Sequence, residues 1–355
     1  MNRENAPGLF IASDARTQYA EDILTALALP AGSVLQLRYD DQYLSQPLRQ
    51  SCVSGESVGR RFMLSFMSAM SSGRHFVIPV RFCRVVDTQV LGGVWVFRVA
   101  MEQYPALDGW PTDSDALEEL GSRLQSDLSD GNDAPFSFAR HSCPLVVGFG
   151  DNDAQSWNQI ARRLSAVPAF GARQHFLKID PPTLLTRSSA LAADDTGTFT
   201  LTEENNHSLA VTYWAAEHDA IASSRLELSV WGEGAALVSP SQVPLKARYD
   251  SYEVMFRSLS ISSPSMCRFD ISITQDSDTS AGARLTAGAQ LTFRLAASRR
   301  RMLARVSVSA LAALLLAVPS MLGPDTPSGV RITIAGLGAV ALGITSSGVG
   351  TWGRK

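Results

Sequence analysis

The segment GESVG, residues 55–59, fits the G-x-S-x-G nucleophile elbow of serine hydrolases, which makes Ser57 a candidate nucleophile. The motif requires an apolar strand directly before it and a helix after it, so that a strained turn exposes the serine hydroxyl. The preceding residues, RQSCVS, make a poor buried strand. We therefore expect Ser57 to cap a following helix, and catalysis by Ser57 is the alternative.

Two further segments lie where a strand is expected to lead into a helix. GFGDND, residues 148–153, suggests a phosphate loop, but it lacks both the G-x-x-x-x-G-K-[ST] and the G-x-G-x-x-G pattern. Its two acids would repel phosphate, so we expect a turn and a helix cap there. Asp14 follows the first expected strand and is assigned as a helix N-cap. A ligand contact by Asp14 at the carboxyl end of that strand is the alternative.

The histidines and cysteines do not form a recognisable metal motif. No histidine pair has H-x-x-x-H or H-E-x-x-H spacing, and no cysteine pair has C-x-x-C spacing. We therefore predict no metal and no cofactor, and four buried thiols in a reducing compartment. The residues concerned are His75, His141, His175, His207, His218, Cys52, Cys83, Cys143 and Cys267.

Residues 1–180 alternate between apolar strands and amphipathic helices, which predicts an α/β or α+β module. The expected strands are Leu9–Ser13, Ser33–Tyr39, His75–Val86, Gly93–Met101, Pro144–Phe149 and Gln174–Ile179. The expected helices are Ala15–Leu29, Arg60–Met70, Asp113–Asp130 and Ala154–Leu164.

Residues 181–298 change to short strands at regular spacing, separated by turn residues. This pattern is typical of an immunoglobulin-like β-sandwich, here with seven strands. The expected strands are 198–202, 208–214, 225–231, 243–249, 252–261, 267–274 and 289–296.

The charge is divided unevenly along the 355 residues. Residues 299–355 carry seven basic residues and one acid, whereas residues 1–298 have a net charge of −9. An acidic body argues against nucleic acid as a partner, because that binding needs Lys and Arg to neutralise phosphates. The first residues, MNRENAPGLF, also lack the apolar run of a secretory signal.

Residues 299–355 contain two long apolar runs, uncharged from Val306 to Leu322 and from Ile332 to Val349, that predict a two-helix transmembrane hairpin. Residues 302–322 would span about 31 Å as a helix, close to a bilayer core of about 30 Å, and residues 332–349 about 27 Å. Basic residues flank both runs on one side, which places the body and the carboxy terminus in the cytoplasm under the positive-inside rule. These topology-setting residues are Arg299, Arg300, Arg301, Arg305, Arg354 and Lys355.

Small residues recur every fourth position along both runs, and such ridges let membrane helices approach closely. They are Ser309, Ala313 and Ala317 in the first run and Ala335, Ala339, Gly343 and Ser347 in the second. The ridges would pack the two arms together, and recruitment of further copies through them is the alternative.

The resulting prediction is an α+β multidomain protein of the inner membrane: a module at 1–180, a sandwich at 181–298 and a hairpin at 299–355. The favoured function is non-enzymatic, with cytosolic sensing or interaction domains, the lipid bilayer and a protein as partners, and self-association through the hairpin. This layout is similar to that of membrane effectors in bacterial antiviral defence systems, as an analogy of architecture. A membrane-tethered hydrolase with a catalytic amino-terminal module and a membrane-proximal assembly scaffold are the alternatives.

Overall fold

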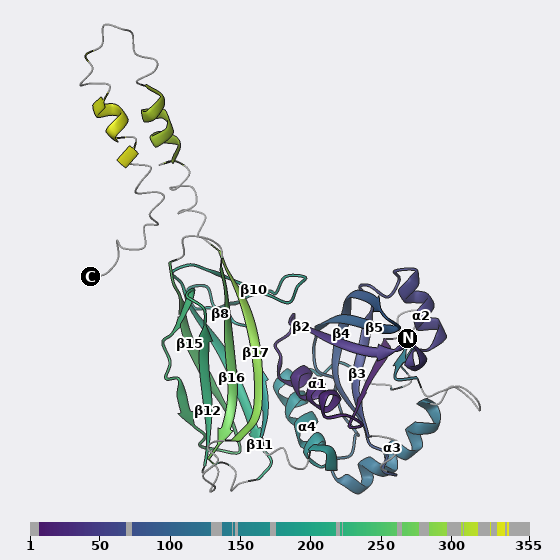
Figure 1. Cartoon of the computed structure of the whole chain (residues 1–355). Helices are drawn as coiled ribbons and strands as arrows, with labels where there is room; N and C mark the ends of the chain where they lie inside the picture. Colours follow the sequence, from purple (N-terminus) through teal and green to yellow (C-terminus); the bar gives the residue numbers. More distant parts are fainter. Residues whose placement is uncertain are drawn as a thin grey trace.

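The computed structural model contains a curled sheet with its helices beside a β-sandwich (Figure 1). It describes residues 7–68, 73–128, 137–143, 145, 148–170, 175–217, 221, 223–260, 265–276, 284–296, 307, 309–318, 327, 332–337 and 339–340. Strands hold 44% of the described residues and helices 26%. The chain is therefore mostly β, which corrects the expected α+β class.

The first sheet has six strands in the order β2-β5-β4-β3-β1-β6. Strands β1 and β3 run parallel, and the other neighbouring pairs of this sheet are antiparallel. All residues of β1 are buried, so this strand is central to the core. The strands are β1 (Gly8–Ser13), β2 (Val34–Asp40), β3 (Arg61–Met67), β4 (Val77–Leu91), β5 (Val94–Met101) and β6 (Ala139–Arg140).

Strand β3 occupies the residues for which the sequence predicts a helix, 60–70, so that prediction is wrong. Its sequence, RFMLSFM, is buried from its second residue to its last. A strand that is covered on both faces is a continuous apolar run without alternation. Periodicity does not distinguish such a run from a buried helix, which explains the error.

The two edges of this sheet curl towards each other. Beyond the end of β2, Leu44 forms a bridge with Ala139 of β6, and the amide of Ser45 donates to the Ala139 carbonyl at 2.9 Å. The Tyr39 hydroxyl donates to the Ile11 carbonyl at 3.2 Å. The carboxyl ends of β1 and β2 therefore lie together, although the two strands are far apart in the sheet order.

Four α-helices pack around this sheet: α1 (Thr17–Ala28), α2 (Gln46–Val53), α3 (Ser114–Leu128) and α4 (Asp153–Ser165). Arg16 occupies the N-cap position of α1, and Asp14 lies in the turn before it, so the predicted cap is wrong. Asn152 caps α4, since its Oδ1 accepts from the amides of Ala154 and Gln155 at 3.0 and 3.2 Å. The predicted turn and helix cap at 148–153 is confirmed.

The second part of the chain is a sandwich of two sheets. One sheet has the order β10-β17-β16-β12-β14, and the other has the order β13-β15-β11-β8-β9 with β7 also paired to β11. The described residues thus give eleven strands rather than seven, and the additional ones are mostly two or three residues long. The strands are β7 (His175–Ile179), β8 (Thr183–Leu184), β9 (Ser189–Ala190), β10 (Phe199–Thr202), β11 (Asn206–Ala215), β12 (Ser224–Trp231), β13 (Ala235–Leu237), β14 (Gln242–Pro244), β15 (Tyr249–Ser258), β16 (Ser265–Gln275) and β17 (Arg284–Ala296).

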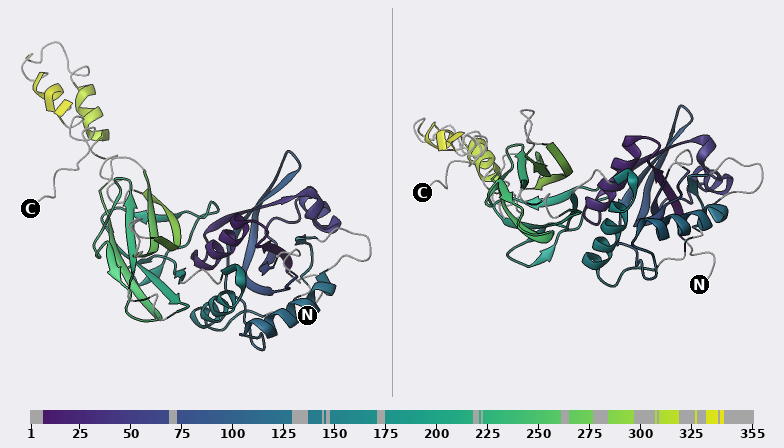
Figure 2. Two further views of the ribbon diagram at one scale, coloured as in Figure 1. Left: turned by 60° about the horizontal axis from the view of Figure 1, so that its bottom comes forward. Right: turned by 90° about the horizontal axis from the view of Figure 1, so that it is seen from below.

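The sandwich packs directly against the curled sheet and its helices. Helix α1 lies on the side that faces the sandwich (Figures 1 and 2), and one cluster of buried apolar side chains extends from Phe10 to Phe293. At the junction, Gly197 has a φ of +80°, and a Cβ there would lie 2.4 Å from the Val34 amide nitrogen. The backbones of the two parts are therefore in contact at this glycine.

The predicted transmembrane hairpin is not supported. Within the described ranges, none of the helices combines the length and the apolar character that a membrane crossing needs. This finding overturns the two-pass topology and the inner-membrane location.

The residues assigned to the hairpin are only partly described. Ser309, Ala313 and Ala317 lie on the helical stretch 309–318, and Ala335 and Ala339 lie on helical residues of 332–340. The others are outside the described residues: Arg299, Arg300, Arg301, Arg305, Gly343, Ser347, Arg354 and Lys355.

We expect His207 to make the sandwich sensitive to acid. Its ring is 1% exposed, stacks on Phe256 at 5.4 Å and places Nε2 3.5 Å from Ser258 Oγ. Burial lowers the pKa of His207, and a hydrogen bond with the Thr202 backbone opposes this in part. The unfolded chain therefore binds this proton at a higher pH than the folded chain. We expect the contribution of neutral His207 to be complete above about pH 6.5 and to be lost as the pH falls below that value.

Urea unfolding of the wild type and of His207→Gln between pH 5 and 7.5 measures this contribution. Because other groups titrate alike in both proteins, they cancel in the difference between the two free energies of unfolding. The wild type should lose more stability than the variant on acidification. Parallel pH profiles for the two proteins would contradict the assignment.

Candidate functional site

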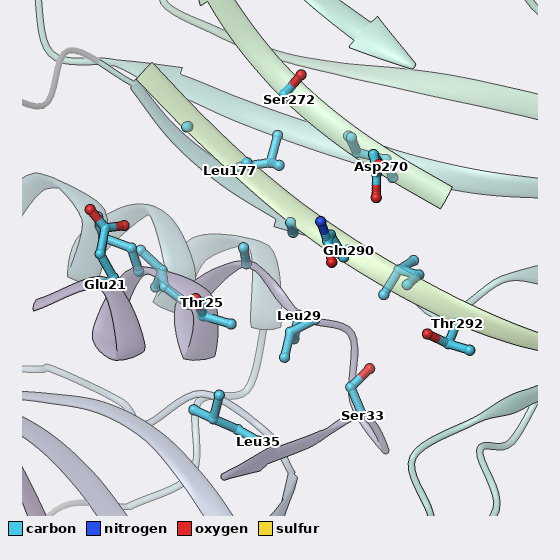
Figure 3. A pocket seen from close by; sticks show the side chains of 18 of the residues that line it. Glu21, Thr25, Leu29, Ser33, Leu35, Leu177, Asp270, Ser272, Gln290 and Thr292 are labelled. Atoms are coloured by element: carbon cyan, nitrogen blue, oxygen red, sulfur yellow. The ribbon is translucent and has the colours of Figure 1, made fainter. Parts of the chain in front are cut away.

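A cleft of about 850 Å³ lies between the curled-sheet part and the sandwich, and we call it the junction cleft. Its walls come from α1, the start of β2, β7, the loop 196–198, β16 and β17. In Figure 3, Glu21 and Thr25 extend from α1, while Gln290 and Thr292 lie on β17 across the cleft. This volume is within the range of about 300–1,000 Å³ that is usual for ligand sites.

The helical wall of the cleft is held in place by Arg81, a buried arginine of β4. Its guanidinium, 2% exposed, donates to the carbonyls of Ala26 and Leu29 at the carboxyl end of α1. It also donates to the Tyr104 hydroxyl at 2.8 Å, and that hydroxyl donates to the Leu27 carbonyl at 2.7 Å. A positive charge is favourable at a helix carboxyl end, where the last carbonyls lack helical partners. Arg81 therefore fixes α1 where the helix borders the cleft.

The opposite wall includes an open strand edge. Strand β17 pairs with β16 along its length, but on its other side β10 pairs only with Phe293–Ala296. In the part of the chain that the structure describes, no strand pairs with that side of β17 between residues 284 and 292. Consecutive residues of this edge, 287–292, line the cleft. Backbone groups of β17 are thus available for pairing on the cleft side.

Small side chains leave this edge accessible. Residues 286–289 read Thr-Ala-Gly-Ala, and Gly288 is exposed. A glycine within a strand is typical of a place where another backbone approaches closely. Leu24 of α1 supplies apolar surface across the cleft, and Leu177 of β7, 3% exposed, also lines it. The site therefore combines a hydrogen-bonding edge with an apolar wall.

The cleft carries negative charge. Among the described residues that line it, Glu21 and Asp270 are acidic and none is a lysine or an arginine. Arg268 lies 3.0 Å from Asp270 and offsets part of that charge. His175 also lines the cleft but is 1% exposed. The cleft is therefore suited to a neutral or cationic occupant.

Ser57, the candidate nucleophile, lies away from this cleft. It is fully buried in the turn between α2 and β3. A nucleophile elbow runs from a strand to a helix and exposes its serine. Here the order is helix, turn, strand, and the hydroxyl is enclosed. The following element is β3, so Ser57 caps no following helix either.

The described histidines and cysteines do not belong to a metal-binding cluster. The described residues contain no group of three His, Cys, Asp or Glu side chains that could hold a metal ion. His218 is outside the described residues. Cys52, Cys83 and Cys267 are buried and Cys143 is partly buried, with no disulfide among them.

Sequence reasoning missed the junction cleft. The strand at Gln174–Ile179 was recognised, but its pairing with Val211–Ala215 of the sandwich was not. The small residues of Thr286–Ala289 were the available signal, since glycine within a strand marks a close backbone approach.

Known proteins give no guide to the cleft. No protein-family model matches the chain. A search of the curated proteins finds no match either. The arrangement of side chains and strand edges in the cleft is therefore the basis for a functional assignment.

Proposed function

We propose that the chain is a non-enzymatic binding protein that holds an extended segment of a partner protein in the junction cleft. The observation that carries this proposal is the edge of β17 at residues 287–292, which lines the cleft and with which no strand of the described chain pairs. Strand addition to such an edge is a recurrent way in which proteins recognise extended peptides.

The partner segment would pair with the same edge of β17 as β10 does. It would lie in line with β10, next to the residues of β17 that precede Phe293. Backbone hydrogen bonds to β17 supply affinity in this mode, and they are independent of the partner's sequence. Residues 287–292 offer roughly 20 Å of edge at about 3.3 Å per residue, enough for about six partner residues. The cleft would therefore hold a short segment.

Side chains on the walls would supply the selectivity. Alternate side chains of a strand point to opposite faces, so one set of the partner's side chains would meet Leu24 and Leu177. The charges of Glu21 and Asp270 favour lysine or arginine in the segment and disfavour aspartate or glutamate. The preferred occupant is thus an extended segment with alternating apolar and basic residues.

Fluorescence anisotropy with four labelled eight-residue peptides tests this proposal on the full chain. The peptides alternate valine with lysine, glutamate or serine, and the fourth is the valine-lysine peptide with every second amide N-methylated. We expect the lysine peptide to bind at least tenfold more tightly than the glutamate peptide. N-methylation should abolish binding, because it removes the donors that pair with β17. Equal binding of all four peptides, or of none, would contradict strand addition.

A pair of matched variants locates the binding. Thr25→Trp places a large side chain in the cleft, whereas Gln18→Trp places the same side chain at an exposed position of α1 that does not line it. The lysine peptide should lose at least tenfold in affinity for the first variant and keep its affinity for the second. Gln290→Trp repeats the test from β17, and circular dichroism checks that each variant is folded. Unchanged binding to both cleft variants would overturn the assignment of the site.

A further inference from the structure

A second, smaller cavity lies at the mouth of the curled sheet, and we call it the mouth pocket. It has a volume of about 220 Å³ and lies at the carboxyl ends of β1 and β2, beside the start of α1. The curl of the sheet creates it, because contacts near Ala139 and the hydrogen bond from Tyr39 to Ile11 bring these two strand ends together. Its volume is below that of sites for drug-sized ligands, so it suits a single or fused ring.

The inner wall of the mouth pocket is apolar and rigid. Ile11, Ala12 and Leu37 line it and are at most 7% exposed. Tyr39 also lines it and is 8% exposed, and its hydroxyl is committed to the Ile11 carbonyl. Its ring further stacks on Phe10 at 5.7 Å, which fixes its orientation. This wall therefore presents an apolar surface to a ligand, because the Tyr39 hydroxyl is already hydrogen-bonded within the protein.

Three partly exposed aromatic rings surround the opening. Tyr19 comes from α1, Tyr43 from the 3₁₀ turn after β2 (η2, Asp41–Tyr43), and Phe138 from the segment before β6. The rings of Tyr43 and Phe138 meet edge to face, with centroids 5.2 Å apart. Aromatic rings favour stacked or edge-to-face contact with another ring. Rings from three separate segments thus select a planar, unsaturated ligand.

The charges around the pocket balance. Asp22 and Asp40 are acidic, and Arg16 and Arg38 are basic. The Arg16 guanidinium lies 5.8 Å from the Tyr19 ring centroid and so already occupies a cation–π position. An organic cation would meet two guanidinium groups and an anion would meet two carboxylates. A neutral ligand avoids both of these electrostatic repulsions.

Asp22 is the polar group that reaches inwards from α1. Burial raises the pKa of Asp22 to about 6, and the charge of Arg38 opposes this rise in part. A carboxyl group near its pKa offers an O–H donor in one form and acceptors in both. It therefore matches a ligand edge on which an N–H group lies beside an acceptor nitrogen or oxygen.

We propose that the mouth pocket binds a neutral, planar nitrogen heterocycle of nucleobase size, stacked against the rings of Tyr19, Tyr43 and Phe138 with its polar edge hydrogen-bonded to the Asp22 carboxyl. The site is separate from the junction cleft and does not depend on the function proposed for it.

Titration calorimetry of the full chain with adenine, cytosine and uracil at pH 6 tests this proposal, with choline and inorganic phosphate as charged probes. At least one base should bind with a dissociation constant below 1 mM, about −4.1 kcal/mol or better. Choline and phosphate should not bind at this site. Binding of choline or phosphate in place of the bases, or no binding of any base, would overturn the proposal.

Three variants separate the contacts. Tyr43→Ala should weaken base binding at least tenfold, whereas Trp231→Ala, at a ring 57% exposed on the sandwich, should leave it unchanged. Asp22→Asn retains a hydrogen-bonding edge but no longer titrates. Base affinity of the wild type should therefore fall between pH 5 and 8 as Asp22 loses its proton, and that of Asp22→Asn should stay level. Wild-type affinity that is independent of pH, or unaffected by Tyr43→Ala, would contradict the assignment.

Discussion

Replacing Arg81 with methionine should lower the free energy of unfolding by about 3 kcal/mol or more, as expected when several buried hydrogen bonds to a charged group are lost. Methionine fills similar space but leaves the carbonyls of Ala26 and Leu29 and the Tyr104 hydroxyl without their donor. Urea unfolding followed by circular dichroism measures this loss.

Two other variants define the cause of that loss. Arg81→Lys keeps the charge but, as a compact ammonium, does not reproduce the fork of donors, so it should recover only part of the stability. Arg268→Met removes an exposed arginine paired with Asp270 and should cost less than about 1 kcal/mol. Equal effects of Arg81→Met and Arg268→Met would show that Arg81 does not hold α1.

Replacing Gly197 with alanine should destabilise the contact between the curled-sheet part and the sandwich. The glycine has a φ of +80°, and the new Cβ would lie 2.4 Å from the Val34 amide nitrogen, so the two backbones must separate. We expect a loss of about 2 to 4 kcal/mol, which combines the cost of a positive φ with that of a steric clash. Urea unfolding gives the loss in stability, and peptide anisotropy reports on the junction cleft.

Gly55 provides a matched control for this substitution. It has a φ of +79°, but among the described residues no atom lies within 4 Å of the place that a Cβ would take. Gly55→Ala therefore bears only the conformational cost of about 1 to 2 kcal/mol. The difference between the two variants isolates the contact at Val34. Equal losses would mean that Gly197 is needed for its backbone angle alone.

The elements were more predictable from the sequence than their pairing. Leu9–Ser13 and Ser33–Tyr39 were predicted as strands from local apolar patterns, and β1 and β2 lie there. The curl that joins their carboxyl ends depends on Leu44 meeting Ala139, residues that are 95 positions apart. Local patterns do not encode such contacts, so neither the junction cleft nor the mouth pocket could be predicted.

For the carboxy-terminal residues, the sequence predicts a feature that the structure does not support. Two predominantly apolar runs, 302–322 and 332–349, have about the length of a bilayer crossing, and this length, together with the flanking arginines, predicts the hairpin. An apolar run of this length permits a membrane-spanning helix but does not require one. Among the described residues, no helix is long and apolar enough to cross a membrane.

Helix α1 is a wall of both cavities. Tyr19 and Asp22 line the mouth pocket, whereas Glu21, Leu24 and Thr25 line the junction cleft. A small rotation of this helix about its axis moves side chains in both cavities at once. Thermodynamic linkage then requires that a ligand which shifts α1 in one cavity changes affinity in the other, and by the same factor in both directions. If both proposed ligands bind, this twelve-residue helix would couple the binding of the partner segment to that of the small molecule.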